Sequence, residues 1–213
     1  MGKTALTLFT SLPVFWAEGD VAELAAGTVE DHWVRTELER DHALVPIDTL
    51  EDLQAQKTLL MIQPRALTPV ENVALDRWVR NGGQLLLLVD PLLETASRYA
   101  LGDRRRPEGT AMLSPILARW GLELLHDQDQ PDTMRMASLP FALPVAQAGE
   151  LRLTGSGHDA ACRLEGGGIL AHCRIGAGTA MIVADAAMMA SGDAPPPQGV
   201  AALSQLLDLA FPS

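Results

Sequence analysis

Cysteine is scarce in this chain: only Cys162 and Cys173 occur among 213 residues. Two cysteines cannot build the framework of several disulfides that holds small secreted domains together. Aromatic residues make up only 4% of the chain, so smaller apolar side chains must fill most of the core. With 47% hydrophobic residues the chain is nevertheless long and apolar enough for one sizeable core, and extensive disorder is not expected.

Positive charge is also in short supply, because 16 lysines and arginines face 27 acidic residues and leave a net charge of -11. A negative surface repels phosphate backbones and anionic lipid headgroups, which argues against nucleic-acid binding and against docking on an acidic membrane. No apolar run approaches the roughly 20 residues that a membrane-spanning helix needs, and no secretory signal is visible. We therefore expect a soluble, cytoplasmic protein that neither inserts into a membrane nor binds nucleic acid.

Signatures of nucleotide binding and acyl transfer are missing as well. The glycine-rich stretch 165–168 is not followed by the Lys-Ser/Thr pair of a phosphate-binding loop. The glycines at 176 and 178 lack a third glycine opening a helix, so both stretches are better explained as hairpin turns. No Gly-x-Ser-x-Gly nucleophile elbow occurs. We therefore expect no cofactor.

What the chain does contain is a strand–helix–strand unit between residues 58 and 91. Residues 58–62 and 84–89 are apolar runs without alternation, which suit strands covered on both faces in a parallel sheet. The segment between them has helical periodicity, and short loops join the three parts. Such βαβ units set parallel strands in one sheet with a right-handed crossover. We expect these two strands to be adjacent and parallel.

The helix of this unit carries local start and stop signals. Thr68 fits the N-cap, and Glu71 can reach back to the cap amide to complete a capping box. The glycine pair 82–83 accepts the left-handed backbone that ends a helix. Glu71 and Asp76 are expected to point away from the core. The apolar face that should be buried comprises Val70, Val73, Ala74 and Trp78.

The remaining pattern predicts a single α/β domain over residues 1–213. Its sheet is mainly parallel with helices on both faces, and a β-rich extension around 134–184 adds antiparallel strands. The strands of that half are too short and too few to close a core of their own. Helical segments are expected at 21–26, 30–40, 49–56, 92–100, 114–120, 186–190 and 200–211.

Two aspartates stand out by position, because each follows a buried strand directly. Asp90 comes after an LLLLV run and Asp185 after MIVA. Ligands of open α/β sheets bind beyond the carboxyl ends of strands, so both carboxylates could face one crevice. There they could bind a divalent cation or perform acid–base chemistry. The alternative is that each aspartate caps the turn or helix that follows it.

Ser11 ends the first predicted strand, 5–10, and therefore also lies at a carboxyl end. The loop after it carries Trp16, so Ser11 and Trp16 are candidates for ligand contact. The alternative is that this loop only packs its aromatic side chains over the sheet edge. The basic run 102–107 leaves a similar choice, between a site for a carboxylate or phosphate and a solvated loop with local salt bridges.

The two cysteines lie near two histidines in the β-rich half. His158, Cys162, His172 and Cys173 are residue types that bind zinc, but the usual paired spacing is absent. Adjacent residues on a strand point to opposite faces, so His172 and Cys173 cannot easily hold one ion. We expect no metal. A disulfide between Cys162 and Cys173 is geometrically feasible but is not expected in a reducing compartment.

Three segments carry a resemblance to a known family. They are LTLFTSLPVFW at 6–16, IQPRALTPVENVALDRWVRNGGQLLLLVDP at 62–91, and RIGAGTAMIVADAAMM at 174–189. Together they resemble the auxiliary domain of uncharacterised ABC-type transport systems, which is related to gliding-motility proteins. The likeness spans most of the chain and is weakest between 100 and 170. It implies a flavodoxin-like α/β fold of the class I glutamine-amidotransferase-like type.

The resemblance implies a non-enzymatic role. Amidotransferases carry a nucleophilic cysteine on a sharp turn after a strand, and here that position reads Val89-Asp90-Pro91. No His-x-Glu pair follows the later strand, where Asp185 stands instead. Members of the family commonly carry membrane anchors, and this chain shows none, so a transport role implies a separate membrane partner.

These observations lead to a non-catalytic binding or scaffold domain that serves an ABC-type transport system. Its expected partner is a permease or another subunit of that system, and a homo-oligomer is compatible with the sequence. The alternative is a hydrolase or metal-dependent enzyme that uses Asp90 and Asp185 in the crevice. A third reading is a small-ligand sensor in which the loop 11–16 covers the crevice.

Overall fold

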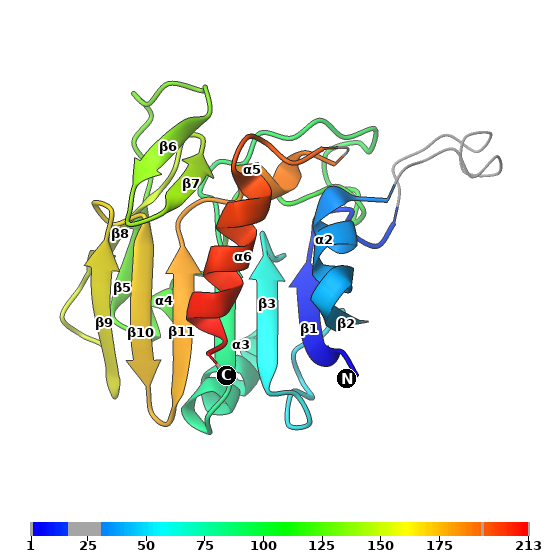
Figure 1. The fold of residues 1–213 in the computed structure, drawn as a ribbon. Coiled ribbons are helices and arrows are strands. Elements are labelled where there is room, and N and C mark those ends of the chain that lie inside the picture. Colours follow the sequence, from blue (N-terminus) through cyan, green and yellow to red (C-terminus); the bar gives the residue numbers. More distant parts are fainter. Residues whose placement is uncertain (1, 17–30, 193, 213) are drawn as a thin grey trace.

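A seven-stranded sheet forms the centre of the computed structural model, which describes residues 2–16, 31–192 and 194–212. Its strand order is β2-β1-β3-β4-β11-β10-β9 (Figure 1). The strands are β1 (Thr4–Thr10), β2 (His42–Pro46), β3 (Thr58–Ile62), β4 (Gln84–Leu88), β9 (Ala160–Glu165), β10 (Leu170–Ile175) and β11 (Gly178–Val183).

Five of these strands run parallel to one another, in the order β2-β1-β3-β4-β11. Leu59 of β3 pairs with Leu85 of β4, and Met61 pairs with Leu87, so the predicted adjacency of the two strands is confirmed. Strands β10 and β9 continue the sheet in antiparallel fashion. The chain is therefore an α/β protein with a mainly parallel sheet, as its buried apolar runs predict.

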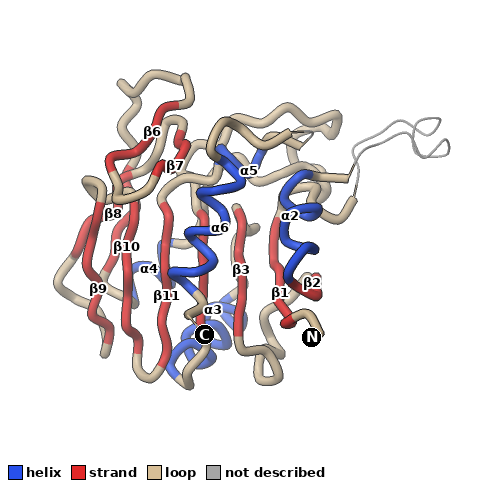
Figure 2. The backbone as a smooth tube through the Cα atoms, viewed as in Figure 1, coloured by secondary structure: helices blue, strands red, loops and turns tan. Residues whose placement is uncertain are grey.

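The β-rich half is only partly an extension of this sheet, which corrects the prediction for 134–184. Strands β6 (Arg135–Ser138) and β7 (Ala142–Val145) form a ribbon of their own, and β5 (Leu122–Leu125) pairs with β8 (Glu150–Leu153). Each of these strands has only four residues. Leu122 and Leu151 bury their side chains in the core on one face of the main sheet, so the β5–β8 ribbon packs over that face. Figure 2 shows β6 and β7 near the top of the sheet.

Helices cover both faces of the sheet (Figure 1). Side chains of α2 (Trp33–Asp41), α5 (Ala187–Ala190) and α6 (Gly199–Ala210) share one core cluster with the sheet residues Leu8, Leu60 and Leu86. Side chains of α3 (Pro69–Arg80) and α4 (Ser114–Arg119) join the cluster on the opposite face. In the described ranges, no helix has both the length and the hydropathy needed to cross a bilayer.

Helix α3 confirms the predicted capping box but turns a different face inward. Val70 and Val73 are 59% and 57% exposed, whereas Glu71 and Asp76 are buried. The predicted assignment of its faces is therefore wrong for Val70, Val73, Glu71 and Asp76, whereas Trp78 is buried as predicted. The two acidic side chains can be buried because both are satisfied: Arg65 binds Glu71 through both carboxylate oxygens, and Asp76 accepts hydrogen bonds from two arginines and a tryptophan.

Two segments predicted as helices, 49–56 and 92–100, are irregular instead, with only isolated turns and bends. Hydrogen bonds from α3 and from the loop before it hold the first segment in a non-helical conformation. Arg65 donates to the Asp48 carbonyl oxygen, and Trp78 donates to the Gln56 carbonyl oxygen. These tertiary hydrogen bonds replace the helical ones. The predicted helix at 21–26 lies outside the described residues.

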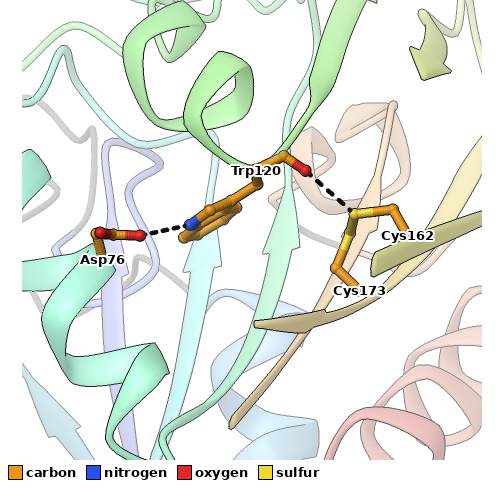
Figure 3. Close-up of a disulfide and its surroundings, with 4 residues drawn as sticks. All are labelled: Asp76, Trp120, Cys162 and Cys173. Atoms are coloured by element: carbon orange, nitrogen blue, oxygen red, sulfur yellow. Dashed lines mark hydrogen bonds between the residues drawn. A yellow bond between two sulfur atoms is a disulfide. The ribbon is translucent and has the colours of Figure 1, made fainter. Parts of the chain in front are cut away.

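Cys162 and Cys173 form a disulfide, contrary to the prediction (Figure 3). The antiparallel register of β9 and β10 places the two residues directly opposite each other, with 4.0 Å between their Cα atoms. The expectation rested on a reducing compartment, whereas the register alone brings the sulfurs together. The Cys162 Sγ lies 3.6 Å from the Trp120 carbonyl oxygen, and the Trp120 Nε1 donates to Asp76. The disulfide thus lies beside the contact between α3 and α4.

Candidate functional site

A groove of about 900 Å³ opens at the carboxyl ends of β1, β2 and β3. From β1 the chain continues to α2 on one face, and from β3 it continues to α3 on the other face (Figure 1). Strand β1 lies between β2 and β3, so the chain reverses its direction across the sheet at this point. Ligands of open α/β sheets bind at such switch points, because the diverging loops leave a crevice between them. This groove is therefore the candidate site.

Four segments line the groove. The end of β1 and its loop supply Thr10, Ser11, Phe15 and Trp16, and the loop after β2 supplies Asp48, Thr49 and Glu51. The start of α3 and the long loop after β4 complete the wall with Arg65, Thr68, Glu71, Arg104, Arg106 and Glu108. Two of the four predicted site residues, Ser11 and Trp16, therefore lie at the groove.

Ser11 connects two segments of the site through hydrogen bonds of its hydroxyl group. Its Oγ donates to the Gln63 carbonyl oxygen at 2.5 Å and accepts from the Glu108 amide at 3.0 Å. These bonds use the single hydroxyl proton and one acceptor position, and they link the end of β1 to the loop after β4. Trp16 is 39% exposed beside it, while Leu12 in the same loop is fully buried. The loop thus packs at one end and lines the groove at the other.

Gln63 is the residue at the strand ends that sequence reasoning missed. It is fully buried and has a backbone φ of 40°, a left-handed conformation that is uncommon for a residue with a side chain. Its Nε2 donates to the carbonyl oxygens of Asp90 and Glu108, and its Oε1 accepts from the Asp90 amide. One side chain therefore joins β3, β4 and the loop over the groove. The signal in the sequence is weak: a polar residue that closes an apolar strand.

Arg65 and Glu71 form the wall of the groove at the start of α3. Two Arg65 nitrogens reach the two Glu71 oxygens at 2.6 and 2.9 Å, and the guanidinium lies 5.0 Å from the centre of the Phe9 ring. The hydrogen bonds from Arg65 lower the pKa of Glu71 to about 2, and those bonds in turn raise the pKa of Arg65. The pair is therefore ionised and neutralised internally at physiological pH.

The arginines of the basic run lie in different surroundings. Arg105 forms an ion pair with Asp103 at 2.7 Å and lies 4.2 Å from the centre of the Tyr99 ring, as in a solvated loop. Arg104 and Arg106 line the groove instead. Arg106 donates to the Tyr99 carbonyl oxygen, and Arg104 is exposed. Part of the run is thus a local salt bridge, and part presents charge to the groove.

Asp90 and Asp185 lie outside the residues that line the groove, although they end the neighbouring strands β4 and β11. Both carboxylates are buried. Asp90 accepts from the amides of Leu92 and Ala186, and Asp185 accepts from those of Ala187 and Ala146. In each case one bond goes to the residue two positions ahead, which is the local turn of the capping interpretation.

Burial changes the proton affinity of this pair. Loss of hydration raises the pKa of Asp90 to about 6, with its backbone hydrogen bonds acting in the opposite direction. Burial also raises the pKa of Asp185 well above its usual range, and the nearby charge of Asp90 raises it further. The negative charge of one carboxylate therefore disfavours ionisation of the other, and both groups hold protons more tightly than ordinary aspartates. Within the described ranges, no group of three or more histidine, cysteine, aspartate or glutamate side chains is placed to hold a metal ion.

No family model matches this chain, and no curated protein does. Solved structures do match it. The mmIFT52 N-terminal domain has a TM-score of 0.61 at 14% identity, over 99% of this chain and 98% of that one. A GH42 beta-galactosidase from G. stearothermophilus has a TM-score of 0.55 at 15% identity, over 98% of this chain and 30% of that one. A beta-galactosidase from Rahnella sp. R3 has a TM-score of 0.53 at 13% identity, over 98% of this chain and 31% of that one.

The chain thus spans about a third of the length of the beta-galactosidases that it matches. At these identities the similarity shows a shared fold alone. It also shows that the same fold occurs both as a named domain and as one portion of a longer enzyme.

Proposed function

We propose that this chain is a non-catalytic binding domain whose binding site is the groove at the β1/β3 switch point. One observation carries the proposal. The polar groups that could perform chemistry at the strand ends are buried and hydrogen-bonded, whereas the open groove offers a mixed aromatic and charged surface. Such a surface suits recognition, because it combines apolar contact with a few placed polar groups.

The hydroxyl of Ser11 supports this proposal. A nucleophilic serine needs a base that takes its proton, and here the Ser11 proton goes to a backbone carbonyl oxygen. The described residues that line the groove include neither histidine nor cysteine. Glu71, the buried carboxylate of the groove, is occupied by Arg65 and by the helix cap. These contacts hold the walls of the groove in place and leave neither Ser11 nor Glu71 available as a nucleophile or base, which supports reversible binding over catalysis.

We further propose that the fold is of the flavodoxin-like, class I glutamine-amidotransferase-like type. The parallel strands support this, because their order β2-β1-β3-β4-β11 corresponds to the order 2-1-3-4-5 of doubly wound flavodoxin-like sheets. A role as an auxiliary part of an ABC-type transport system, with a permease or another subunit as partner, remains a proposal based on the sequence resemblance. Such a subunit would bind its partner or ligand through the groove.

A second candidate function is an enzyme that uses Asp90 and Asp185. It is favoured by the raised pKa of both carboxyls, since perturbed acids cluster at active sites. Separate Asp90→Asn and Asp185→Asn variants decide between the two. A binding domain keeps its ligand affinity in both variants, whereas an enzyme loses turnover.

A fragment screen by saturation-transfer NMR tests the proposed site. Thr49 is exposed at the groove, and Thr49→Trp should fill part of it. Val70→Trp is the matched control, because Val70 is exposed on α3 outside the groove. We expect fragments that bind the native chain to be lost with Thr49→Trp and kept with Val70→Trp. If no fragment distinguishes the two variants, the groove is not the binding site.

A further inference from the structure

The groove has an aromatic side and a basic side that come from different parts of the chain. The loop after β1 contributes Phe15 and Trp16. The long loop after β4 contributes Arg104 and Arg106. A flat ring can lie against the aromatic side chains, and guanidinium groups pair well with carboxylate or phosphate oxygens.

The loop that carries the basic side is held in place by hydrogen bonds between side chains and its backbone atoms. Both polar backbone groups of Glu108 are engaged: its amide donates to Ser11 and its carbonyl oxygen accepts from Gln63. The Arg106 side chain donates to the Tyr99 carbonyl oxygen, which directs the guanidinium from within the same loop. The loop is therefore bonded to residues at the ends of β1 and β3. These bonds fix the backbone from which Arg104 and Arg106 reach the groove.

The charges in the groove are unevenly distributed. Arg65 is paired with Glu71, and the charges of Asp48 and Glu108 act on it as well. Glu51 lies on the same loop as Asp48 and is exposed. By contrast, no ion pair with Arg104 or Arg106 is formed by the residues that the structure describes. These two arginines are thus the available positive charges of a groove in a chain whose net charge is -11.

We propose that the groove binds a small planar molecule that carries a carboxylate or phosphate, with the ring against Phe15 and Trp16 and the anion on Arg104 and Arg106. This proposal rests on the proposed function and names its ligand class. Arg104 and Arg106 select the anion, and the aromatic side chains select the flat ring. A neutral analogue of the same ring cannot form charge-assisted hydrogen bonds with the two guanidinium groups. Losing such bonds lowers the affinity by about tenfold or more.

Two pairs of probes test the proposal by isothermal titration calorimetry at low salt. AMP and adenosine share a ring and differ in the phosphate, and indole-3-acetate and tryptophol share a ring and differ in the carboxylate. We expect the anionic member of at least one pair to bind about tenfold more tightly than its neutral partner. The pair that shows the preference identifies the acidic group. Equal affinities within both pairs would overturn the proposal, and so would an absence of binding.

Variants in the basic loop show where the preference arises. The double variant Arg104→Ala/Arg106→Ala should lower the affinity for the anionic probe to that of the neutral one. Arg105→Ala is the matched control, because Arg105 pairs with Asp103 and does not line the groove. It should leave the affinity within about twofold, since its exposed charge is already paired with Asp103 and solvent screens it. If the double variant binds as the native chain does, the anion does not lie on these arginines. Circular dichroism of each variant confirms that it is folded.

The aromatic side has its own readout. Three of the four tryptophans are buried, and Trp16 is the one exposed at the groove, so its fluorescence should be quenched when the ring binds. Trp16→Leu should remove the quenching and weaken both members of a probe pair equally.

The proposed binding site and the proposed ligand class can fail separately. If fragments still reach the groove without any preference for anions, the ligand class is wrong and the binding domain stands; if none reach it, both are wrong.

Discussion

At the scale of single residues, the buried carboxyl groups define how this molecule responds to pH. Asp90 and Asp185 hold protons more tightly in the folded chain than in the unfolded chain, because burial disfavours their charged forms. Glu71 does the opposite, because Arg65 and the cap of α3 stabilise its charged form. These two kinds of site act on stability in different pH windows.

Stability should fall as the pH rises through the window of the aspartates. The pKa of Asp90 is raised from 3.8 to about 6, so the folded state binds more protons than the unfolded state between these values. The free energy of unfolding should therefore decrease from about pH 4 to about pH 7, by up to about 3 kcal/mol for two pKa units. Urea unfolding at several pH values measures this. Asp90→Asn should make the curve less steep, with Asp185 supplying the remaining slope, and an unchanged slope would contradict the assignment.

Glu71 should govern the acid side. Its pKa is lowered from 4.5 to about 2, so its contribution is present above pH 4.5 and is lost as the pH falls below that value. Glu71→Gln removes the charge of the capping box and of the Arg65 pair. We expect a loss of about 1–2 kcal/mol at pH 7, because Arg65 is partly exposed and solvent screens the pair. The difference should shrink towards pH 2; a constant difference would mean that the charge is not the cause.

At the scale of elements, the β9–β10 hairpin and the loop 102–108 are each held by contacts that local propensity does not supply. The hairpin is cross-linked by the disulfide, which lies against Trp120 after α4 (Figure 3). The loop has no regular structure, and Ser11 and Gln63 tie it to the sheet. The disulfide itself is local, but its contact with Trp120 and the bonds of Ser11 and Gln63 to the loop join segments that are distant in the sequence.

Reducing the disulfide should destabilise the molecule. The cross-link closes a loop with a sequence separation of 11, and the loss of this constraint on the unfolded chain corresponds to about 3 kcal/mol. Unfolding in urea with and without dithiothreitol measures the difference, with free thiols counted to confirm reduction. The double variant Cys162→Ala/Cys173→Ala is the control and should not respond to the reductant. Equal stability of the oxidised and reduced native chain would show that the cross-link is not a constraint.

Removing the hydrogen bond between Ser11 and the basic loop should increase local opening of that loop without unfolding the core. Ser11→Ala removes the acceptor of the Glu108 amide, so the exchange of that amide with solvent should accelerate by about tenfold. Hydrogen exchange followed by NMR measures it residue by residue. Ser156→Ala is a suitable control, because its hydroxyl is exposed and pairs with its near neighbour Thr154. Unchanged exchange at Glu108 in the Ser11 variant would show that another contact holds the loop.

At the scale of the whole molecule, the parts that the sequence predicts correctly are the ones with local signals. Strands β3 and β4 were predicted because a parallel strand covered on both faces is an unbroken apolar run. The capping box of α3 was predicted because its partners are three residues apart. The carboxyl-end positions of Asp90 and Asp185 follow in the same way from the apolar runs of β4 and β11.

The parts that were missed depend on contacts between distant segments. The inward face of α3 depends on Arg65, Arg119 and Trp120, which satisfy its acidic side chains. The groove depends on β1 lying between β2 and β3, which no periodicity reveals. The division of the basic loop into groove-lining and salt-bridged arginines also needs the folded path. Ser11 and Trp16 both line the groove, and their role in ligand contact stays a prediction; the hydroxyl of Ser11 bonds to Gln63 and Glu108.

The central claim is that ligands bind at the β1/β3 switch point and not at the buried aspartates. A ¹H–¹⁵N NMR titration of the labelled chain with an anionic probe such as AMP tests it most directly. We expect shift changes at Ser11, Phe15, Thr68, Arg104 and Glu108, which border the groove. Changes confined to the amides that bind the two aspartates, at Leu92, Ala146, Ala186 and Ala187, would contradict it.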